Sequence, residues 1–247
     1  MSAGLTAAGV AVGAWLAYAW LPHLATPACV WRGPRDRRRV ALSFDDGPDP
    51  AWTPRVLALL ARLGVRGTFF LVGARAARAA EVVRDTAAAG HEIANHSWSH
   101  SSLWLRGPRA TGEEIGRAHE LLGDLSGRAP RLFRPPWGMV NAAMYPALRR
   151  CNERCVFWSI QGEGLRPRSP SAQAAHVRER AHAGAIVDLH DAEGLPGAPA
   201  RLLAALAVMV DELRGAGYEL VTVSELLMDL EGGIACPPPT LPHSREL

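Results

Sequence analysis

Hydrophobic positions along the chain follow two alternating patterns that predict a repeated order of strand and helix. After Arg39, short runs rich in β-branched and aromatic residues are each followed by a longer stretch with apolar residues at helical spacing. This alternation is typical of a mainly parallel sheet covered by helices. The runs expected to form strands are residues 40–44, 67–72, 91–95, 131–134, 155–160, 185–189 and 218–223.

Glycine and proline residues mark the ends of the expected helices. Helices are predicted from Thr53 to Gly64, over 75–89 before Gly90, from Thr111 onward, and over 201–214 before Gly215. Seven strands in such a series predict an α/β fold, an irregular or incomplete (β/α) barrel. We assign this barrel to residues 31–231 as one domain, because no second domain is apparent.

The first 30 residues have a different character. No charged side chain occurs from Ser2 to Leu21, and about 20 apolar residues span a bilayer as a helix. Trp15, Tyr18 and Trp20 gather at the end of this stretch, as aromatic residues do at a membrane interface. These features predict one hydrophobic anchor helix that passes the membrane once. Its many Ala and Gly residues leave a cleaved signal peptide and a buried helix as alternatives.

The residues after the anchor indicate its orientation in the membrane, and the end of the chain forms a separate segment. Five arginines follow the anchor between residues 32 and 39 and none precedes it, which favours a cytoplasmic main domain. Residues 232–247, with three consecutive prolines, are predicted to form a flexible tail.

Composition narrows the class of protein. Its 247 residues are 48% hydrophobic and 21% charged, which excludes a disordered protein. All 27 basic residues are Arg, and the net charge of +3 is too small to indicate nucleic-acid binding. The four cysteines form no CxxC pair, so their spacing indicates neither a zinc ribbon nor a disulfide framework, and we interpret Cys151 and Cys155 as core residues.

Side chains suited to metal chemistry follow the first and third predicted strands. Asp45 and Asp46 precede a Gly-Pro turn, and His96 and His100 are four residues apart, a spacing that places two imidazoles on one face of a helical turn. One carboxylate and two imidazoles are a common set of metal ligands that leaves positions open for water and substrate.

Further polar groups follow two later strands. Arg134 begins the segment Arg-Pro-Pro-Trp-Gly, and His190 lies between Asp188 and Asp191. Each group alone is equally compatible with an ordinary turn or strand end. Together they occupy the carboxyl ends of successive strands, which is where barrel enzymes place their active sites.

These motifs, in this order, resemble those of the NodB-type polysaccharide deacetylases, carbohydrate esterase family four. The resemblance rests on Ser-Phe-Asp-Asp-Gly-Pro at 43–48, His-Ser-Trp-Ser-His at 96–100, Arg-Pro-Pro-Trp-Gly at 134–138 and Leu-His-Asp at 189–191. It extends from about Arg38 to Leu227 and includes a closing strand and helix at 217–226.

The resemblance implies a metal-dependent hydrolase that removes an N-acetyl or other small acyl group from an amino sugar in a polysaccharide, oligosaccharide or lipid-linked glycan. Zinc is the expected metal, with cobalt and nickel as alternatives, and the envelope side of the membrane is the expected location. The implied roles are metal ligand for Asp46, His96 and His100, base for Asp45, general acid for His190, orientation of Asp45 for Arg134, and substrate binding for Pro135, Trp137 and Leu189.

One segment departs from the family pattern. The family carries an acidic motif after the fifth strand, but residues 158–164 read Trp-Ser-Ile-Gln-Gly-Glu-Gly, with Gln161 in place of an acid. Glu163 is the candidate substitute, and Asp191 is a second candidate for a supporting carboxylate. Two other functions stay open on this basis: a non-catalytic carbohydrate-binding protein with the same fold, and an amide hydrolase with a different substrate.

Overall fold

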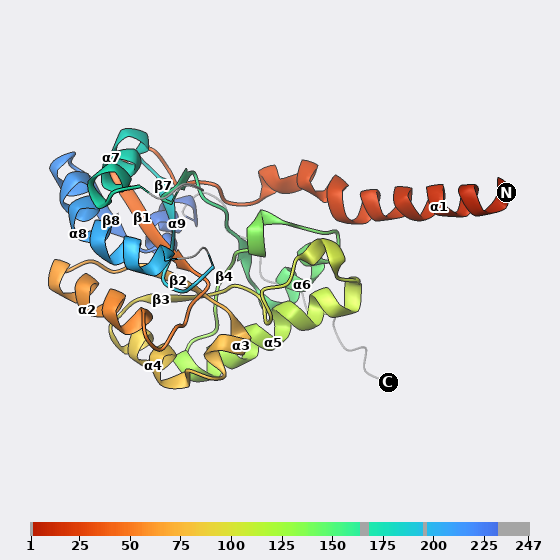
Figure 1. Cartoon of the computed structure of the whole chain (residues 1–247), viewed down its shortest axis with the longest axis horizontal. Coiled ribbons are helices and arrows are strands. Elements are labelled where there is room, and N and C mark those ends of the chain that lie inside the picture. The colour runs from red at the N-terminus through yellow and green to blue at the C-terminus, as the bar shows by residue number, and fades with distance from the viewer. Residues whose placement is uncertain (1, 164–167, 195–196, 232–247) are drawn as a thin grey trace, which may run out of the picture.

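The computed structural model describes residues 2–163, 168–194 and 197–231, and its core is one parallel sheet (Figure 1). The sheet follows the order β5-β4-β3-β2-β1-β7-β6, and β8 pairs with β1 beside this path. The strands are β1 (Arg39–Asp45), β2 (Thr68–Leu71), β3 (Glu92–Asn95), β4 (Leu132–Phe133), β5 (Arg154–Cys155), β6 (Ile160–Gln161), β7 (Ala185–His190) and β8 (Glu219–Val221).

The two edges of the sheet lie close together because the chain passes directly from one to the other. The edge strands β5 and β6 are separated only by residues 156–159. Val156 donates a backbone hydrogen bond to Phe133 of β4, and Ser159 donates one to Ile186 of β7. The expected irregular barrel is therefore confirmed as a curled, incompletely closed sheet, whereas the single strand expected over 155–160 is wrong, because this segment crosses between the edges.

Strand β1 lies at the centre of the sheet. It pairs with β7 along one edge, while β8 pairs with residues 39–41 and β2 with residues 43–45 along the other. Successive side chains of a strand point to opposite faces. Leu42 and Phe44 accordingly pack with the surrounding helices, whereas Ala41, Ser43 and Asp45 face the inside of the barrel.

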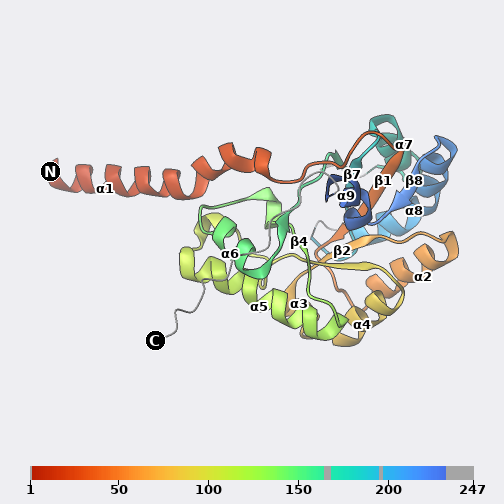
Figure 2. The ribbon, with the colours of Figure 1, turned by 180° about the vertical axis from the view of Figure 1, so that it is seen from behind.

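Helices cover the outside of the sheet (Figures 1 and 2). They are α2 (Thr53–Leu63), α3 (Gly73–Ala76), α4 (Ala80–Ala88), α5 (Pro108–Ser126), α6 (Met144–Cys151), α7 (Pro170–Arg180), α8 (Ala198–Gly215) and α9 (Val223–Glu231), with short 3-10 turns η3 (Leu103–Leu105) and η4 (Pro136–Gly138). Gly64 ends α2 in the left-handed region (φ 60°), as expected. The single helix expected over 75–89 is two helices, α3 and α4.

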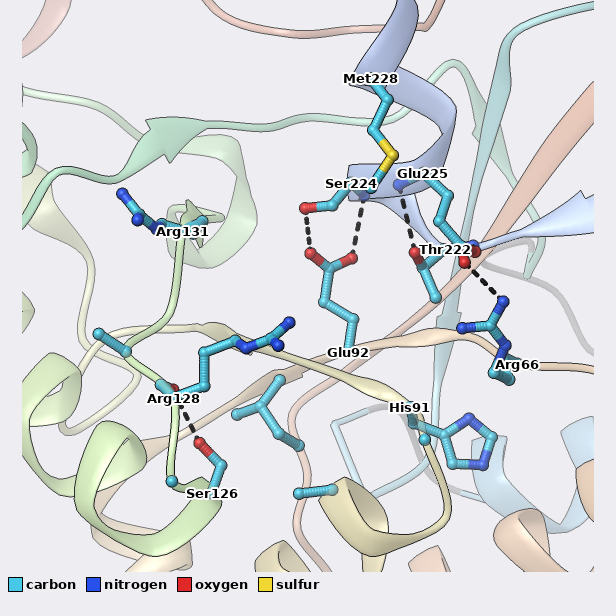
Figure 3. A pocket seen from close by; sticks show the side chains of 15 residues that line it. Arg66, His91, Glu92, Ser126, Arg128, Arg131, Thr222, Ser224, Glu225 and Met228 are labelled. Carbon is cyan, nitrogen blue, oxygen red and sulfur yellow. Dashed lines mark hydrogen bonds and ion pairs between the residues drawn. The ribbon is translucent and has the colours of Figure 1, made fainter.

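Hydrogen bonds from β3 fasten the last helix across the amino ends of the strands. The Glu92 carboxylate accepts hydrogen bonds from the backbone amide and hydroxyl of Ser224, at the start of α9 (Figure 3). It also accepts one from the Thr68 hydroxyl. A cavity of about 550 Å³ opens beside these residues, and Arg66, Arg128 and Arg131 contribute to its wall. It lies at the end of the sheet opposite the predicted catalytic groups.

The amino-terminal segment extends away from the barrel (Figures 1 and 2). Helix α1 (Ser2–Trp15) has 14 residues and continues as a π-helical turn, η1 (Leu16–Trp20), and a 3-10 segment, η2 (Leu21–Ala28). The Trp15 indole donates a hydrogen bond to the backbone carbonyl of Trp104, within η3. The Tyr18 hydroxyl donates one to the backbone carbonyl of Arg106, just after η3. Among the described residues no helix has both the length and the apolar character needed to cross a membrane, so the expected anchor helix is not confirmed. The expected tail, 232–247, falls outside the described residues.

Candidate active site

A cavity of about 500 Å³ opens at the carboxyl ends of the strands, where the sequence motifs predict an active site. The carboxyl ends of β1, β6 and β7 contribute to its wall, together with segments that follow β1, β2, β3, β4, β5 and β7. Its lining residues are Asp45, Asp46, Arg75, His96, His100, Pro135, Trp137, Trp158, Gln161, Asp188, His190, Glu193 and Gly194.

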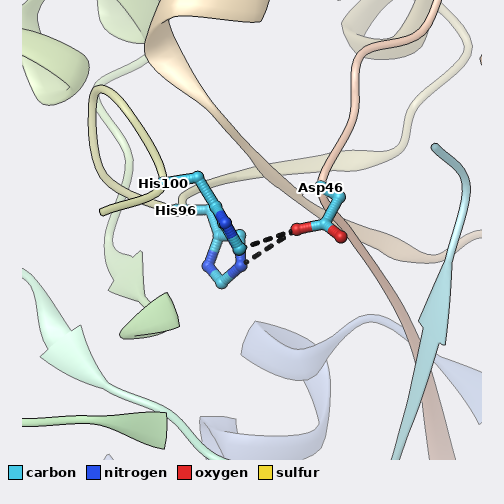
Figure 4. Close-up of side chains that lie close together, drawn as sticks. All are labelled: Asp46, His96 and His100. Carbon is cyan, nitrogen blue, oxygen red and sulfur yellow. Dashed lines mark ion pairs between the residues drawn. The ribbon is translucent and has the colours of Figure 1, made fainter. Parts of the chain in front are cut away.

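Three of these side chains converge on one point (Figure 4). His100 Nε2 lies 2.9 Å and His96 Nε2 3.6 Å from Asp46 Oδ1. One ligand atom from each residue falls within 4.8 Å of the others, which is close enough for all three to hold a single ion. Burial opposes ionisation of Asp46, but its bonds to His100 and His96 hold the pKa of this carboxyl well below its usual range.

The two histidines converge through a loop. Residues 96–100 are not helical, so the expected helical turn is wrong. Ser97 and His100 instead adopt left-handed conformations, with φ of 66° and 54°, and the Ser97 hydroxyl accepts a hydrogen bond from the His100 amide. Asp46 is also left-handed, with φ of 72°. Such strain in residues other than glycine is concentrated at functional sites.

Hydrogen bonding prepares His96 to act as a ligand. Its Nδ1 lies 2.7 Å from the backbone carbonyl of Arg134, which accepts the Nδ1 proton and leaves Nε2 directed at Asp46. This arrangement fixes the imidazole tautomer as in known metal sites. Gly194 lies against Asp46 on the other side, since a Cβ atom at residue 194 would be 2.0 Å from Asp46 Oδ2. The donor set and its support fit a divalent metal such as zinc.

Arg134 is fully buried and fixes the second carboxylate of the site. Its Nη1 donates to Asp45 Oδ1 at 2.6 Å and to Asp188 Oδ1 at 3.2 Å. Its Nη2 donates to the backbone carbonyl of Phe157 at 3.1 Å, and the ring of Phe70 lies 4.0 Å below the guanidinium carbon. A buried guanidinium with these partners holds Asp45 in one orientation.

His190 faces the cavity with its ring anchored by an acid from β6's loop. Glu163 Oε2 lies 3.2 Å from His190 Nδ1, and Glu163 Oε1 accepts the backbone amide of His190 at 3.2 Å. Burial opposes protonation of His190. The hydrogen bond to Glu163 and the charges of Asp188 and Asp45 outweigh burial and raise the pKa of His190 to about 10.

Comparison with known proteins gives the family. A profile described as polysaccharide deacetylase matches residues 32–156. A peptidoglycan-N-acetylglucosamine deacetylase of Bacillus cereus is 34% identical over 204 residues, which cover 80% of this chain and 92% of that protein. The chain belongs to the polysaccharide deacetylase family. It is a hydrolase that acts on carbon–nitrogen bonds other than peptide bonds.

Two further relatives agree with this assignment. A chitooligosaccharide deacetylase of Bradyrhizobium is 32% identical over 204 residues, which cover 76% of this chain and 90% of that protein. The crystal structure of the Bc1960 peptidoglycan N-acetylglucosamine deacetylase superposes with a TM-score of 0.78 at 29% identity, covering 85% of this chain and 98% of that one.

In the segment after β5 that departs from the family pattern, Gln161 and Glu163 make the polar contacts. Gln161 donates from Nε2 to Asp188 Oδ2 at 2.9 Å, and Glu163 bonds to His190. Asp188 therefore links Gln161 to Arg134. The sequence interpretation named Asp188 only as a neighbour of His190, although two residues of one strand separated by a single position share a face.

The three residues expected to bind substrate differ in position. Pro135 and Trp137 line the cavity, and the Trp137 side chain is 59% exposed with its ring edge-to-face to His100 at 4.5 Å. Leu189 does not line it. Strand alternation turns Leu189 away from Asp188 and His190 and into the core under the helices, where it is fully buried. The structure therefore places Leu189 away from the cavity wall, although the resemblance implies a substrate-binding role for it.

Asp191 supports the loop that carries Asp46. It accepts a hydrogen bond from the hydroxyl of Thr53, at the start of α2, and it lies so close to Gly47 that a Cβ atom there would be 2.7 Å from its carboxylate. Burial raises the pKa of Asp191 to about 7. The site also includes Arg75, which donates to the backbone carbonyl of Asp46 at 2.8 Å and which no sequence motif singled out.

Proposed function

We propose that this protein is a metal-dependent deacetylase that removes the N-acetyl group from N-acetylglucosamine units of a glycan. The observation that carries the proposal is the placement of Asp46, His96 and His100 around one point beside Asp45 and His190. The relatives are named as deacetylases of peptidoglycan and of chitooligosaccharide, which supports a glycan of N-acetylated amino sugars as the substrate.

The metal would be held by Asp46 Oδ1 and by Nε2 of His96 and His100. A divalent ion there supplies a Lewis acid, which polarises the acetyl carbonyl and lowers the pKa of water. The chain contributes the positioning: the Arg134 carbonyl orients His96, and the left-handed turns at Asp46 and His100 bring the ligands together.

Asp45 is the proposed general base. Its Oδ1 is engaged by Arg134, and its Oδ2 lies 3.7 Å from His96 Nε2, so it adjoins the ligand cluster. From this position Oδ2 accepts a proton from the attacking water as the water adds to the acetyl carbon. The hydrogen bond from the Arg134 guanidinium to Oδ1 leaves Oδ2 as the oxygen beside the ligand cluster.

His190 is the proposed general acid. Its Nδ1 is engaged by Glu163, so Nε2 is the nitrogen left to donate. Because an amide nitrogen is a poor leaving group unless it gains a proton, donation from His190 allows the C–N bond to break and releases acetate and the free amine. The raised pKa of His190, about 10, keeps this proton in place at neutral pH.

The proposal is tested by measuring acetate release from N-acetylglucosamine oligomers and from peptidoglycan with the full chain. We expect Asp45→Asn to lower kcat by at least about 100-fold, because it removes the base while keeping the shape of the side chain. Asp85→Asn, on the exposed side of α4, is the matched control and is expected to keep full activity. Equal rates for wild type and Asp45→Asn would refute the assigned role.

A further inference from the structure

Two cysteines far apart in the sequence meet where the amino-terminal segment joins the sheet. Cys29 and Cys155 are both buried, with 8% and 7% of their surface exposed. Their side chains belong to one apolar cluster. Spacing in the sequence gave no sign of this pair, because Cys29 precedes the barrel and Cys155 lies on β5.

The backbone places the pair in register. Val30 and Val156 form a parallel β-bridge, in which Val30 donates to the Cys155 carbonyl at 2.8 Å and Phe157 donates to the Val30 carbonyl at 2.7 Å. Cys29 and Cys155 each precede a bridge residue, so they lie side by side on adjacent extended segments. Adjacent strands are about 4.8 Å apart, within the range of about 4.4–6.8 Å between the Cα atoms of a disulfide.

We propose that Cys29 and Cys155 form a disulfide bond that ties the amino-terminal segment to the sheet. The oxidant is an external disulfide, of low molecular weight or on a thiol–disulfide exchange protein. Neither cysteine lines the cavity of the candidate active site, so the disulfide can be tested without any assay of the proposed deacetylation.

The bond forms by two exchange steps. The Cys29 thiolate attacks one sulfur of the external disulfide, which breaks and releases its first thiol. Cys155 then attacks the Cys29 sulfur in the mixed disulfide and releases the second thiol. Two electrons and the two cysteine protons pass to the external disulfide. Cys29 is the better attacking group, because the hydrogen bond from Cys155 lowers its pKa, whereas burial raises the pKa of Cys155.

The proposed disulfide would fix a segment that also holds Arg134 of the candidate active site. The backbone carbonyls of Val156 and Phe157 accept hydrogen bonds from Arg134 at 3.4 and 3.1 Å. Phe157 also stacks on Trp31, with ring centroids 4.2 Å apart. In the reduced protein two backbone hydrogen bonds hold Val30 against this segment, and local opening there exposes the thiols. The disulfide removes this opening and fixes the carbonyls that hold Arg134.

Among the residues that the structure describes, Cys151 is the competing partner for Cys155. It lies at the end of α6, half-buried in the same apolar cluster as Cys29 and Cys155. Trypsin separates the three residues, because cleavage follows Arg32, Arg150 and Arg154. Cys29 then falls on peptide 1–32, Cys151 on 151–154 and Cys155 on 155–168, where Pro167 protects the bond after Arg166.

The experiment is peptide mapping of the full chain after refolding in oxidised glutathione, with free thiols blocked by iodoacetamide. We expect peptides 1–32 and 155–168 to be joined by a bond that dithiothreitol breaks, in wild type and in Cys151→Ser. The joined pair is expected to be absent from Cys29→Ser. Blocked, unjoined peptides at every glutathione ratio, or Cys155 joined to Cys151, would overturn the proposal.

Thermal unfolding gives a second readout. Closing so long a loop stabilises the folded state, and we expect the unfolding temperature of the oxidised protein to exceed that of the reduced protein by about 5 °C or more. Cys29→Ala, which keeps a small apolar side chain, is expected to show no difference between the two conditions. A wild-type protein whose unfolding temperature does not change on oxidation would contradict the proposed tie.

Discussion

Glu163 Oε2 lies 3.2 Å from Nδ1 of His190, and the same carboxylate accepts the backbone amide of His190. This acid is two residues beyond Gln161, which occupies the position of the family's acid. The carboxylate that supports the proposed catalytic histidine therefore reaches it from a shifted position in the loop after β6. Four features of the site and the fold lead to separate predictions.

The first prediction concerns the charge of Glu163. Removing it in Glu163→Gln lowers the pKa of His190, because the hydrogen bond to an ionised acid stabilises the imidazolium. The proposed reaction needs His190 in its protonated form, so a lower pKa makes the activity fall at a lower pH. We expect the basic limb of the kcat/KM profile to move down by about 1–2 pH units. Glu179→Gln, on the exposed end of α7, is the control. An unmoved basic limb would show that Glu163 does not tune His190.

The second prediction concerns the space beside Asp46. In Gly194→Ala the new Cβ atom would lie 2.0 Å from Asp46 Oδ2, so the carboxylate must turn away from His96 and His100. We expect zinc affinity, measured by competition with a chelating dye, to fall by at least about tenfold. Gly215→Ala has no atom within 4 Å of its Cβ and is expected to bind zinc as wild type does. Unchanged affinity in Gly194→Ala would mean that Asp46 is not a ligand.

The third prediction concerns the buried guanidinium. Arg134→Met leaves Asp45 and Asp188 buried without their shared cation. Removing one partner of a buried ion pair costs about 3–5 kcal/mol, so we expect the urea midpoint to fall accordingly. Arg84→Met, on an exposed ion pair of α4, is expected to change stability by less than about 1 kcal/mol. A small change in the free energy of unfolding of Arg134→Met would show that Asp45 and Asp188 become protonated without a large loss of stability.

The fourth prediction concerns the pH dependence of stability. Burial, aided by the charge of Arg66, lowers the pKa of His91 to about 4, and its neutral Nδ1 accepts the Gly67 amide. The unfolded chain therefore binds the extra proton between about pH 6.5 and 4, so this contribution is complete above about pH 6.5 and is lost as the pH falls. Figure 3 shows the His91 ring turned away from the Glu92 carboxylate.

The measurement for His91 is urea unfolding at several pH values, compared with His91→Gln. The variant keeps a side-chain acceptor but does not titrate, and we expect its stability to fall less steeply between pH 6.5 and 4, by roughly 2 kcal/mol over that range. Parallel curves for the two proteins would show that His91 takes up its proton in the folded state as readily as in the unfolded state.

The sequence predicted those parts of the structure that depend on local pattern. Alternating strands and helices indicated the barrel, and the residues at strand ends do meet in one cavity. The sequence did not predict the break between β5 and β6, because closure of the sheet depends on contacts with β4 and β7. Nor did the spacing of His96 and His100 reveal their loop, since the left-handed turns there are set by neighbours such as Asn95, whose side chain accepts the Ser97 amide.

Two features of the structure depart from what the sequence pattern suggests. Leu189 follows its family motif, but strand alternation directs it outward between the inward-facing Asp188 and His190. The first residues read as one apolar helix, yet the backbone changes from an α-helix to a π-helical turn after Trp15, where the segment first contacts η3. Both outcomes depend on tertiary contacts that a one-dimensional pattern does not contain.

The central claim is that Asp46, His96 and His100 hold the metal on which deacetylation depends. Its most direct test is acetate release from N-acetylglucosamine oligomers by the full chain, after removal of metal and after return of zinc or cobalt, with bound metal counted in each sample. The account predicts no release without metal, recovery on adding one ion per chain, and neither binding nor recovery in His96→Ala. Acetate release at the full rate from the metal-free protein, or from His96→Ala, would contradict it.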